Sequence, residues 1–254
     1  MEKLFNKDCL EVFREIESES VDLIITDCPY HIVQGGCSTG AYGNQCKDIL
    51  GKKSGQESDI YTKQGKLFKF NEIKFSEWLP ECFRILKANH HIYIYINARN
   101  LAELQREAEK VGFEFQQILV WDKGNATPNR YYLNACEFIL MLRKGKAKNI
   151  NNMGTMNILR IPNIIGNKLH PTEKPVELNK IMIANSTNKG DLVMDCFMGA
   201  GSSGVACKEL ERDFIGIEID KKYFDIAEKR INGVNIDRNK KDGQMSLFDL
   251  ENKE

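Results

Sequence analysis

The sequence has no long apolar run, no Cys-x-x-Cys pair, and only 4 His and 6 Pro among its 254 residues. Its apolar runs are short, as at residues 21–26 and 92–96, whereas an α-helix needs about 20 apolar residues to cross a bilayer. The first eight residues contain no apolar core of signal-peptide length. We therefore expect no membrane segment and a cytoplasmic protein.

The 8 cysteines are expected to be free thiols, because disulfides do not persist in a reducing cytosol. Without a Cys-x-x-Cys pair, and with few histidines, the sequence predicts no structural zinc site and no other metal site. Lys and Arg (36) balance Asp and Glu (36), so no overall field attracts the chain to a polyanion. Neutrality does not exclude nucleic acid, since binding needs only a local positive surface.

Short β-branched runs alternate with longer stretches of helical periodicity, which indicates an α/β fold with a mostly parallel twisted sheet and helices on both faces. The expected strands cover residues 21–26, 91–97, 117–121, 136–142, 192–195 and 214–219. The expected helices cover residues 76–87, 100–111, 175–186, 202–210 and 221–231. We predict a single domain over residues 1–232 with polar segments inserted near 31–75 and 122–169, followed by a flexible tail over 233–254.

A glycine-rich turn follows the expected strand 192–195. Gly199, Gly201 and Gly204 match the pattern G-x-G-x-x-G, which lets backbone N–H groups and a helix N-terminus approach a nucleotide-like ligand. Glu218, 17 residues after Gly201, ends the next expected strand and suits hydrogen bonds from the two hydroxyls of a ribose. Taken alone, these residues are consistent with an NAD-dependent oxidoreductase.

Asp195 changes that interpretation. A carboxylate directly before the glycine turn would repel a pyrophosphate, but it could pair with the ammonium of an amino-acid-bearing cofactor. The stretch DCFMGAG at residues 195–201 resembles the D-x-F-x-G-x-G motif of DNA amino-methyltransferases, which bind S-adenosylmethionine. The resemblance implies that this cofactor is bound by Asp195, Phe197, Gly199, Gly201 and Glu218.

The tetrapeptide Asp27-Cys28-Pro29-Tyr30 directly follows the expected strand 21–26 and resembles the D-P-P-Y catalytic motif of the same family. The exocyclic amine of adenine or cytosine is a poor nucleophile, because its lone pair is delocalised into the ring. Acceptors at both N–H bonds would localise that lone pair for attack on a sulfonium methyl. Asp27 could supply one acceptor through its side chain and Cys28 another through its main-chain carbonyl, while Tyr30 would stack on a base flipped out of the duplex.

Cys28 stands where the family pattern has proline, so the carbonyl is retained and the rigid φ of proline is lost. Methylation of cytosine at ring carbon five uses a cysteine nucleophile in a Pro-Cys dipeptide, whereas here Cys28 precedes Pro29. An exocyclic amine needs no covalent activation. We therefore expect direct methyl transfer.

Two further segments extend the resemblance. Asp8, within NKDCL at residues 6–10, matches a family position beside the adenine of the cofactor. The segment HPTEKP at residues 170–175 resembles the family's H-P-T-x-K-P segment, which borders the cofactor pocket and implies a cofactor role for Lys174. The tetrapeptide comes first and the cofactor loop last, which resembles the β arrangement of amino-methyltransferases and implies a Rossmann-like methyltransferase fold with permuted motif order.

The resemblance implies a site-specific methyltransferase that acts on double-stranded DNA. Asp at the first position of the tetrapeptide favours adenine in this family, while cytosine stays open as the second candidate base. The oxidoreductase, a methyltransferase acting on RNA or on protein glutamine, and a DNA-binding module without turnover also stay open. Residues 31–71 and 122–169 are expected to contact phosphates and base edges. A homodimer is expected by analogy with family members.

The tail contains the pentapeptide Gln244-Met245-Ser246-Leu247-Phe248 in a polar context. It resembles the Q-x-x-L-F peptide by which bacterial DNA enzymes attach to the replication sliding clamp. Leu247 and Phe248 would fill an apolar pocket of the clamp, and Gln244 would add a hydrogen bond. A tail that folds back onto its own domain is equally compatible with this pattern.

Overall fold

The computed structural model describes residues 2–29, 73–127, 132–234 and 236. The chain divides into two compact units, one made of Met1–Cys28 and Phe75–Glu254, the other of Pro29–Lys74. All helices and strands named below belong to the first unit. None of the helices in the described part of the chain combines the length and apolarity needed to cross a bilayer.

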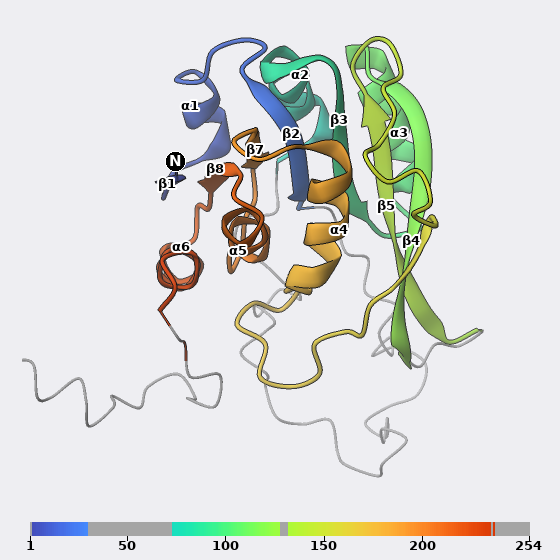
Figure 1. Cartoon of the computed structure of the whole chain (residues 1–254), viewed down its shortest axis with the longest axis vertical. Helices are drawn as coiled ribbons and strands as arrows, with labels where there is room; N and C mark the ends of the chain where they lie inside the picture. Colours follow the sequence, from blue (N-terminus) through green and yellow to red (C-terminus); the bar gives the residue numbers. More distant parts are fainter. Residues whose placement is uncertain (1, 30–72, 128–131, 235, 237–254) are drawn as a thin grey trace, which may run out of the picture. The chain divides into compact units, whose positions relative to one another are not determined.

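The described residues contain one sheet, in which the strands lie in the order β1-β8-β7-β2-β3-β5-β4-β6 (Figure 1). β5 runs antiparallel to both of its neighbours, β3 and β4, and every other adjacent pair is parallel. The strands are β1 (Glu2–Phe5), β2 (Val21–Asp27), β3 (Leu86–Ile96), β4 (Glu114–Thr127), β5 (Asn134–Arg143), β6 (Ile158–Arg160), β7 (Leu192–Asp195) and β8 (Asp213–Ile217).

Helices cover both faces of this sheet. One layer contains α1 (Cys9–Phe13), α2 (Phe75–Ile85) and α3 (Leu101–Val111), and the other contains α4 (Val176–Ser186), α5 (Ser202–Glu209) and α6 (Lys221–Ile231) (Figure 1). The layers separate because the chain moves away from β2 in one direction, to β3, and away from β7 in the other, to β8, while each crossover keeps the same hand. The predicted α/β class with a mostly parallel sheet is confirmed.

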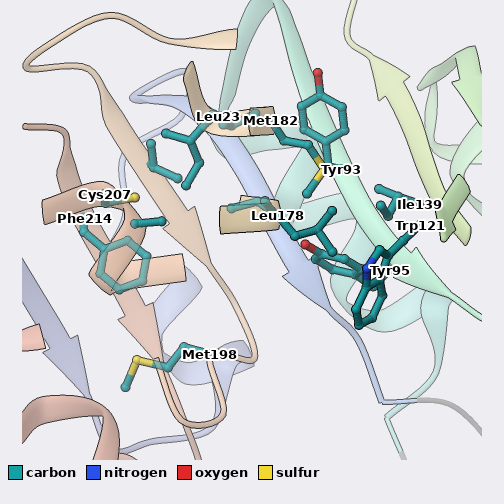
Figure 2. Close-up of a cluster of buried hydrophobic side chains, with 14 of the residues drawn as sticks. Leu23, Tyr93, Tyr95, Trp121, Ile139, Leu178, Met182, Met198, Cys207 and Phe214 are labelled. Carbon is teal, nitrogen blue, oxygen red and sulfur yellow. The ribbon is translucent and has the colours of Figure 1, made fainter. Parts of the chain in front are cut away.

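The central strand β2 is apolar on both faces because helices cover both. Leu23, Ile24 and Ile25 are all fully buried, which explains why the sequence reads as a continuous apolar run instead of an alternating one. On the α4 side, Leu178 and Met182 join Leu23 in the main core cluster (Figure 2). Burial of each such side chain contributes about 2 kcal/mol to the stability of the fold, so well-packed side chains hold the central strands and their ends in place.

Several elements differ from the expected ones. β3 begins at Leu86, five residues before the predicted start, and β4 continues to Thr127, where it pairs with β5. The short strand β6 lies in the polar stretch 144–169, where no strand was predicted, and neither β1 nor α1 was predicted. The strands β1 and β6 are short and partly exposed, so their sequences contain no sustained apolar period. Pairing with the neighbouring strands stabilises them.

Candidate active site

The candidate site lies at the carboxyl ends of β2 and β7, two adjacent parallel strands in the middle of the sheet. The chain leaves these two strands toward opposite edges, and ligands of open α/β sheets bind at such a topological switch point. Asp27 is the last residue of β2 and Asp195 the last residue of β7. Thr26 links them, since its Oγ1 donates a hydrogen bond to Asp195 Oδ1 at 2.8 Å.

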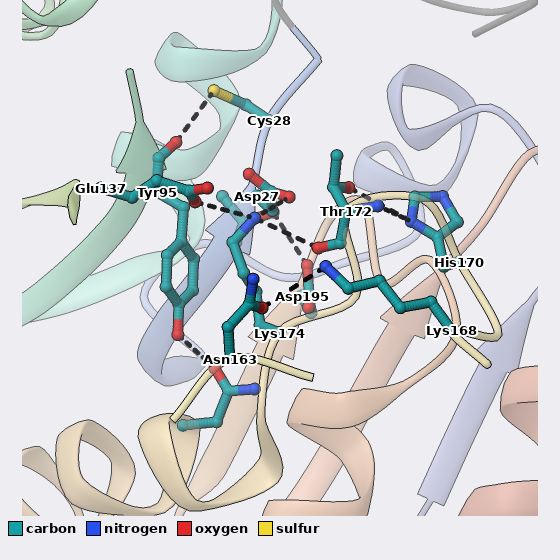
Figure 3. A network of polar contacts seen from close by, with 12 residues as sticks. Asp27, Cys28, Tyr95, Glu137, Asn163, Lys168, His170, Thr172, Lys174 and Asp195 are labelled. Atoms are coloured by element: carbon teal, nitrogen blue, oxygen red, sulfur yellow. Dashed lines mark hydrogen bonds and ion pairs between the residues drawn. The ribbon is translucent and has the colours of Figure 1, made fainter. Parts of the chain in front are cut away.

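Asp27 accepts a short hydrogen bond from Lys174, whose Nζ lies 2.6 Å from Asp27 Oδ2 (Figure 3). Burial raises the pKa of the Asp27 carboxyl, and the ammonium of Lys174 and the hydroxyl of Thr172 offset part of that rise. Lys174 comes from the segment just before α4, far from β2 in the sequence. Folding therefore brings a cation to the first residue of the D-C-P-Y tetrapeptide.

Lys174 has a second carboxylate neighbour. Glu137 Oε2 lies 3.5 Å from Lys174 Nζ, and Glu137 Oε1 accepts a hydrogen bond from Lys123 Nζ at 2.5 Å. Burial acts to lower the pKa of Lys174, but Asp27 and Glu137 together raise it above its ordinary value. Burial acts to raise the pKa of Glu137, yet the positive charges of Lys174 and Lys123 hold that pKa below its ordinary value. Lys174 and Glu137 are therefore both charged at neutral pH.

Cys28 is buried, and its thiol donates to the carbonyl of Tyr95 with a sulfur–oxygen distance of 4.0 Å. Burial, followed by the negative charge of Asp27, raises the pKa of this thiol well above its ordinary value. The thiol is therefore protonated and unsuited to nucleophilic attack. Pro29 is the first residue of the second unit, and Tyr30 lies outside the described residues, so its predicted stacking role stays a prediction.

Asp195 is held by three donors. Besides Thr26, the hydroxyl of Ser203 donates to Oδ2 at 2.5 Å and the backbone N–H of Phe197 donates to Oδ1 at 3.1 Å. Burial raises the pKa of Asp195 to about 6, although the three hydrogen bonds favour its ionised form. Phe197 itself packs edge-on against Trp78, with 5.5 Å between the ring centroids.

Glu218 directly follows β8 and spans the glycine turn. Its Oε2 accepts from the backbone N–H of Gly199 at 2.9 Å, and its Oε1 accepts from the backbone N–H of Asp220 at 2.8 Å. Burial raises the pKa of Glu218 to about 7. This carboxylate therefore fixes the turn while its remaining lone pairs can accept further hydrogen bonds.

The glycines of the turn are required for two different reasons. Gly199 has φ +53° and Gly201 has φ +76°, left-handed conformations that side chains disfavour. A Cβ on Gly201 would lie 2.9 Å from Ala227 Cβ, and a Cβ on Gly204 would lie 2.4 Å from Ile231 Cδ1. Gly201 and Gly204 thus permit close packing of α6, a reason independent of any ligand.

Asp8 caps α1, since its Oδ1 accepts a hydrogen bond from the backbone N–H of Leu10 at 2.8 Å. Its predicted place beside the adenine of a cofactor stays a prediction. The same holds for the predicted cofactor role of Lys174, whose contacts at Nζ are with Asp27, Glu137 and the Thr172 carbonyl.

The chemistry around the turn suits the predicted cofactor better than a dinucleotide. The carboxylate of Asp195 directly precedes the turn and would repel a pyrophosphate, while Glu218 suits the ribose hydroxyls of either cofactor. A ligand with an ammonium and ribose hydroxyls would instead find an ionic partner and hydrogen-bond acceptors. S-adenosylmethionine carries these groups and no phosphate, so the residues present fit it.

Sequence reasoning missed three members of the site. Thr26 and Ser203 bind Asp195, and Glu137 faces Lys174. Ser203 gave a usable signal, because a hydroxyl in the first turn of the helix after a strand-end carboxylate can reach that carboxylate. Glu137 gave a weaker one, a charged residue near the start of an otherwise apolar strand.

Comparisons with known proteins agree on a family. Residues 21–229 match a family model of the N6/N4 type described as DNA methylase. The chain is 30% identical over 251 residues to the type II methyltransferase M2.DpnII of Streptococcus pneumoniae, covering 91% of this chain and 90% of the relative. It is 30% identical over 250 residues to the type II methyltransferase M.HinfI of Haemophilus influenzae, covering 89% and 67%.

Solved structures give the same picture. The crystal structure of the M1.HpyAVI–SAM complex is similar, with TM-score 0.65, 29% identity, and coverage of 91% of this chain and 100% of that one. The cytosine-N4-specific PvuII DNA methyltransferase has TM-score 0.68 at 17% identity, covering 93% and 88%. The second likeness supports the fold alone.

Proposed function

This chain belongs to the N6/N4 DNA methylase family, and on that premise we propose that it methylates the exocyclic amine of an adenine flipped out of double-stranded DNA. It is an S-adenosylmethionine-dependent DNA methyltransferase. The family excludes the oxidoreductase interpretation, which rested on the glycine turn and Glu218. The observation that carries the proposal is that Asp27 ends β2 beside Asp195, which ends the adjacent strand β7. Thr26, the residue before Asp27, donates a hydrogen bond to Asp195.

The residues around the glycine turn would hold the cofactor. Asp195, fixed by Thr26 and Ser203, is placed to pair with an ammonium, and Glu218 is placed to accept from hydroxyls. When bound, S-adenosylmethionine supplies a methyl group on a positively charged sulfur. Because β2 and β7 are adjacent, Asp195 and Asp27 would address the cofactor and the base from neighbouring strand ends.

Asp27 would activate the amine. Its carboxylate accepts one N–H of the target amine, and the main-chain carbonyl of Cys28 accepts the other, so that the nitrogen lone pair is drawn out of the ring. Attack of the nitrogen on the methyl carbon would break the carbon–sulfur bond and release the sulfur as a neutral thioether, and the proton that the nitrogen then loses would pass to the Asp27 carboxylate and on to solvent. Since the Cys28 thiol is buried and protonated, its part is limited to the main chain.

The first test is Asp27→Ala. We expect turnover with duplex DNA to fall by about 10²-fold or more, because an acceptor aimed at the reacting amine is lost. Affinity for S-adenosylmethionine should stay within about twofold, since its proposed ligands are untouched. The measurement is transfer of a tritiated methyl group to DNA, beside cofactor titration by calorimetry.

Asp225→Ala is the matched control, because Asp225 is a half-exposed residue of α6 whose ion-pair partner is Lys221. It should methylate like the wild type. Wild-type turnover by Asp27→Ala would refute the proposed mechanism. Mass spectrometry of nucleosides from the product then distinguishes the target base, with N6-methyladenine expected and N4-methylcytosine as the result that would correct it.

The remaining proposals concern partners. Residues 122–169 are proposed to contact the DNA, and a homodimer is proposed by analogy with the family. Gln244, Leu247 and Phe248 are proposed to bind the sliding clamp, although this pentapeptide lies outside the described residues. Purified clamp should retain the wild-type chain, and Leu247→Ala with Phe248→Ala should abolish retention. Equal retention of both proteins would end the clamp proposal.

A further inference from the structure

Four charged side chains of alternating sign form a line that starts at Asp27. The nitrogen–oxygen distances are 2.6 Å from Lys174 to Asp27, 3.5 Å from Lys174 to Glu137, and 2.5 Å from Lys123 to Glu137. Figure 3 shows Lys174 between the two carboxylates. Asp27 belongs to the tetrapeptide and Lys174 to the H-P-T-x-K-P segment, so the line connects the proposed catalytic carboxylate to Glu137 and Lys123, which lie outside every motif.

The line crosses a strand of the sheet. Asp27 on β2 is in register with Tyr95 on β3, and Tyr95 is in register with Ile139 on β5, the strand that carries Glu137. The ammonium of Lys174 lies over the Tyr95 ring, 5.1 Å from its centroid. Lys174 therefore bridges from β2 to β5 above the aromatic face, which favours a cation at that place.

Tyr95 is itself fixed from the other side. Its hydroxyl donates to Asn179 Oδ1 of α4 at 2.8 Å, and its ring is 2% exposed. Lys174 also donates to the Thr172 carbonyl at 3.2 Å. The Lys174 side chain is buried, and Tyr95 and Thr172 contact its ammonium from fixed positions. The direction in which the ammonium points is therefore set by the attraction of the two carboxylates, Asp27 and Glu137.

From this arrangement we infer that Glu137 is a positioning residue, which acts through Lys174 to orient the Asp27 carboxylate toward the target amine. The inference rests on the proposed function, in which Asp27 binds that amine. Without the charge of Glu137, Lys174 would pair with Asp27 alone. The carboxylate would then be drawn toward the ammonium, and it would be a weaker acceptor for an N–H group.

The charge of Glu137 also acts on Asp27 directly. The groups that face Asp27 are Lys174 and Thr172 from the segment before α4, Glu137 from β5, Asp195 from β7, Tyr95 from β3, and the neighbouring Cys28. Among these, the Glu137 carboxylate raises the pKa of Asp27. Removal of its charge should therefore let Asp27 ionise at lower pH.

The test compares Glu137→Gln with Glu137→Asp and the wild type. We expect Glu137→Gln to lower kcat about 10-fold, because a small misorientation of an activating group is costly. KM for DNA and the Kd for S-adenosylmethionine should change by less than about twofold. The acid limb of the kcat profile should move to lower pH, and Glu137→Asp should restore most of kcat.

Glu114→Gln is the matched control, since Glu114 is an exposed carboxylate on β4 paired with Arg143. It should leave kcat and the pH profile unchanged. An unfolding curve for each variant shows whether the fold is retained.

Three outcomes distinguish the explanations. A Glu137→Gln variant with lowered stability but an unmoved kcat and pH profile would assign Glu137 a structural role and overturn the inference. If Glu137→Gln had the kcat and pH profile of the wild type while Asp27→Ala were inactive, the inference would also be overturned, but the proposed function would stand. If Asp27→Ala were fully active, the proposed function would fail instead.

Discussion

Among single residues, the carboxyls of Asp195 and Glu218 beside the glycine turn both lose solvation in the fold, which disfavours their charged forms. The pKa of Asp195 is raised to about 6 and that of Glu218 to about 7, in both cases mainly by burial. Hydrogen bonds from backbone and hydroxyl donors act against this effect and only partly offset it. A cationic ligand would supply the missing compensation at Asp195.

The raised pKa of Glu218 predicts that the difference in stability between Glu218→Gln and the wild type depends on pH. Glu218 binds its proton more tightly in the folded state, with a pKa of about 7 against an ordinary value of 4.5. Its ionisation therefore destabilises the wild-type fold as pH rises between those values. Between pH 4.5 and pH 7, the free energy of unfolding of the glutamine variant should rise by up to about 3 kcal/mol relative to that of the wild type.

Urea unfolding of both cofactor-free proteins at pH 4.5, 6 and 8 measures this difference. Comparison of the two proteins removes the effect of His91 and His170, whose lowered pKa values act in the opposite sense. A stability difference that is the same at all three pH values would contradict the prediction.

Residues at strand ends could be predicted from the sequence, and their partners could not. Asp27, Asp195 and Glu218 each follow an apolar run, so their place at one edge of the sheet follows from the pattern. Lys174 and Asp27 are 147 positions apart, and nothing local in either segment indicates that they meet. The cofactor role that the resemblance implies for Lys174 stays a prediction, and the contact of its ammonium with Asp27 appears only in the folded chain.

Between elements, a buried ion pair joins α6 to the segment that carries Lys174. Arg230 of α6 lies 3.1 Å from Glu173, with side-chain exposures of 9% and 0%. Arg230 also donates to the carbonyl of Ala200 in the glycine turn at 2.6 Å, and Glu173 accepts from the backbone N–H of Leu169 at 2.8 Å. One pair therefore holds together the proposed cofactor turn, the last helix and the Lys174 segment.

We predict that Glu173→Gln lowers the free energy of unfolding by about 3 kcal/mol, because it removes one charge of a buried ion pair. Glu211→Gln is the matched control. Glu211 pairs with Lys189, but both side chains are about two-thirds exposed, so the cost should be much smaller. Urea unfolding measures both variants, and equal effects would show that burial of the pair is unimportant.

The elements that were predictable are those whose sequences carry a sustained apolar pattern. β2, β7 and α6 follow the expected ranges closely, since each has a sustained apolar pattern. β1 and β6 have four and three residues and lie at the two edges of the sheet. Their formation depends on the strands beside them, a non-local effect that no short sequence window contains.

At the scale of the whole molecule, cofactor binding should stabilise the fold. A ligand at a hundredfold excess over its Kd contributes about 2.7 kcal/mol to the native state. For a chain of this size that corresponds to a rise in Tm of roughly 5 °C or more. S-adenosylmethionine should produce this shift in a thermal melt, and Asp195→Asn should reduce it. A comparable shift with NADH would contradict the assigned ligand chemistry.

The position of the first strand beside the last has a consequence for biosynthesis. β1 pairs with β8, and β2 has β7 on one side, with Leu23 opposite Val193. While the chain emerges from a ribosome, the middle strand has an open edge until residues 192–195 of β7 have been made. Such an edge invites wrong partners. A transcript cut short before codon 192 would thus yield a chaperone or protease client, and no working half-enzyme.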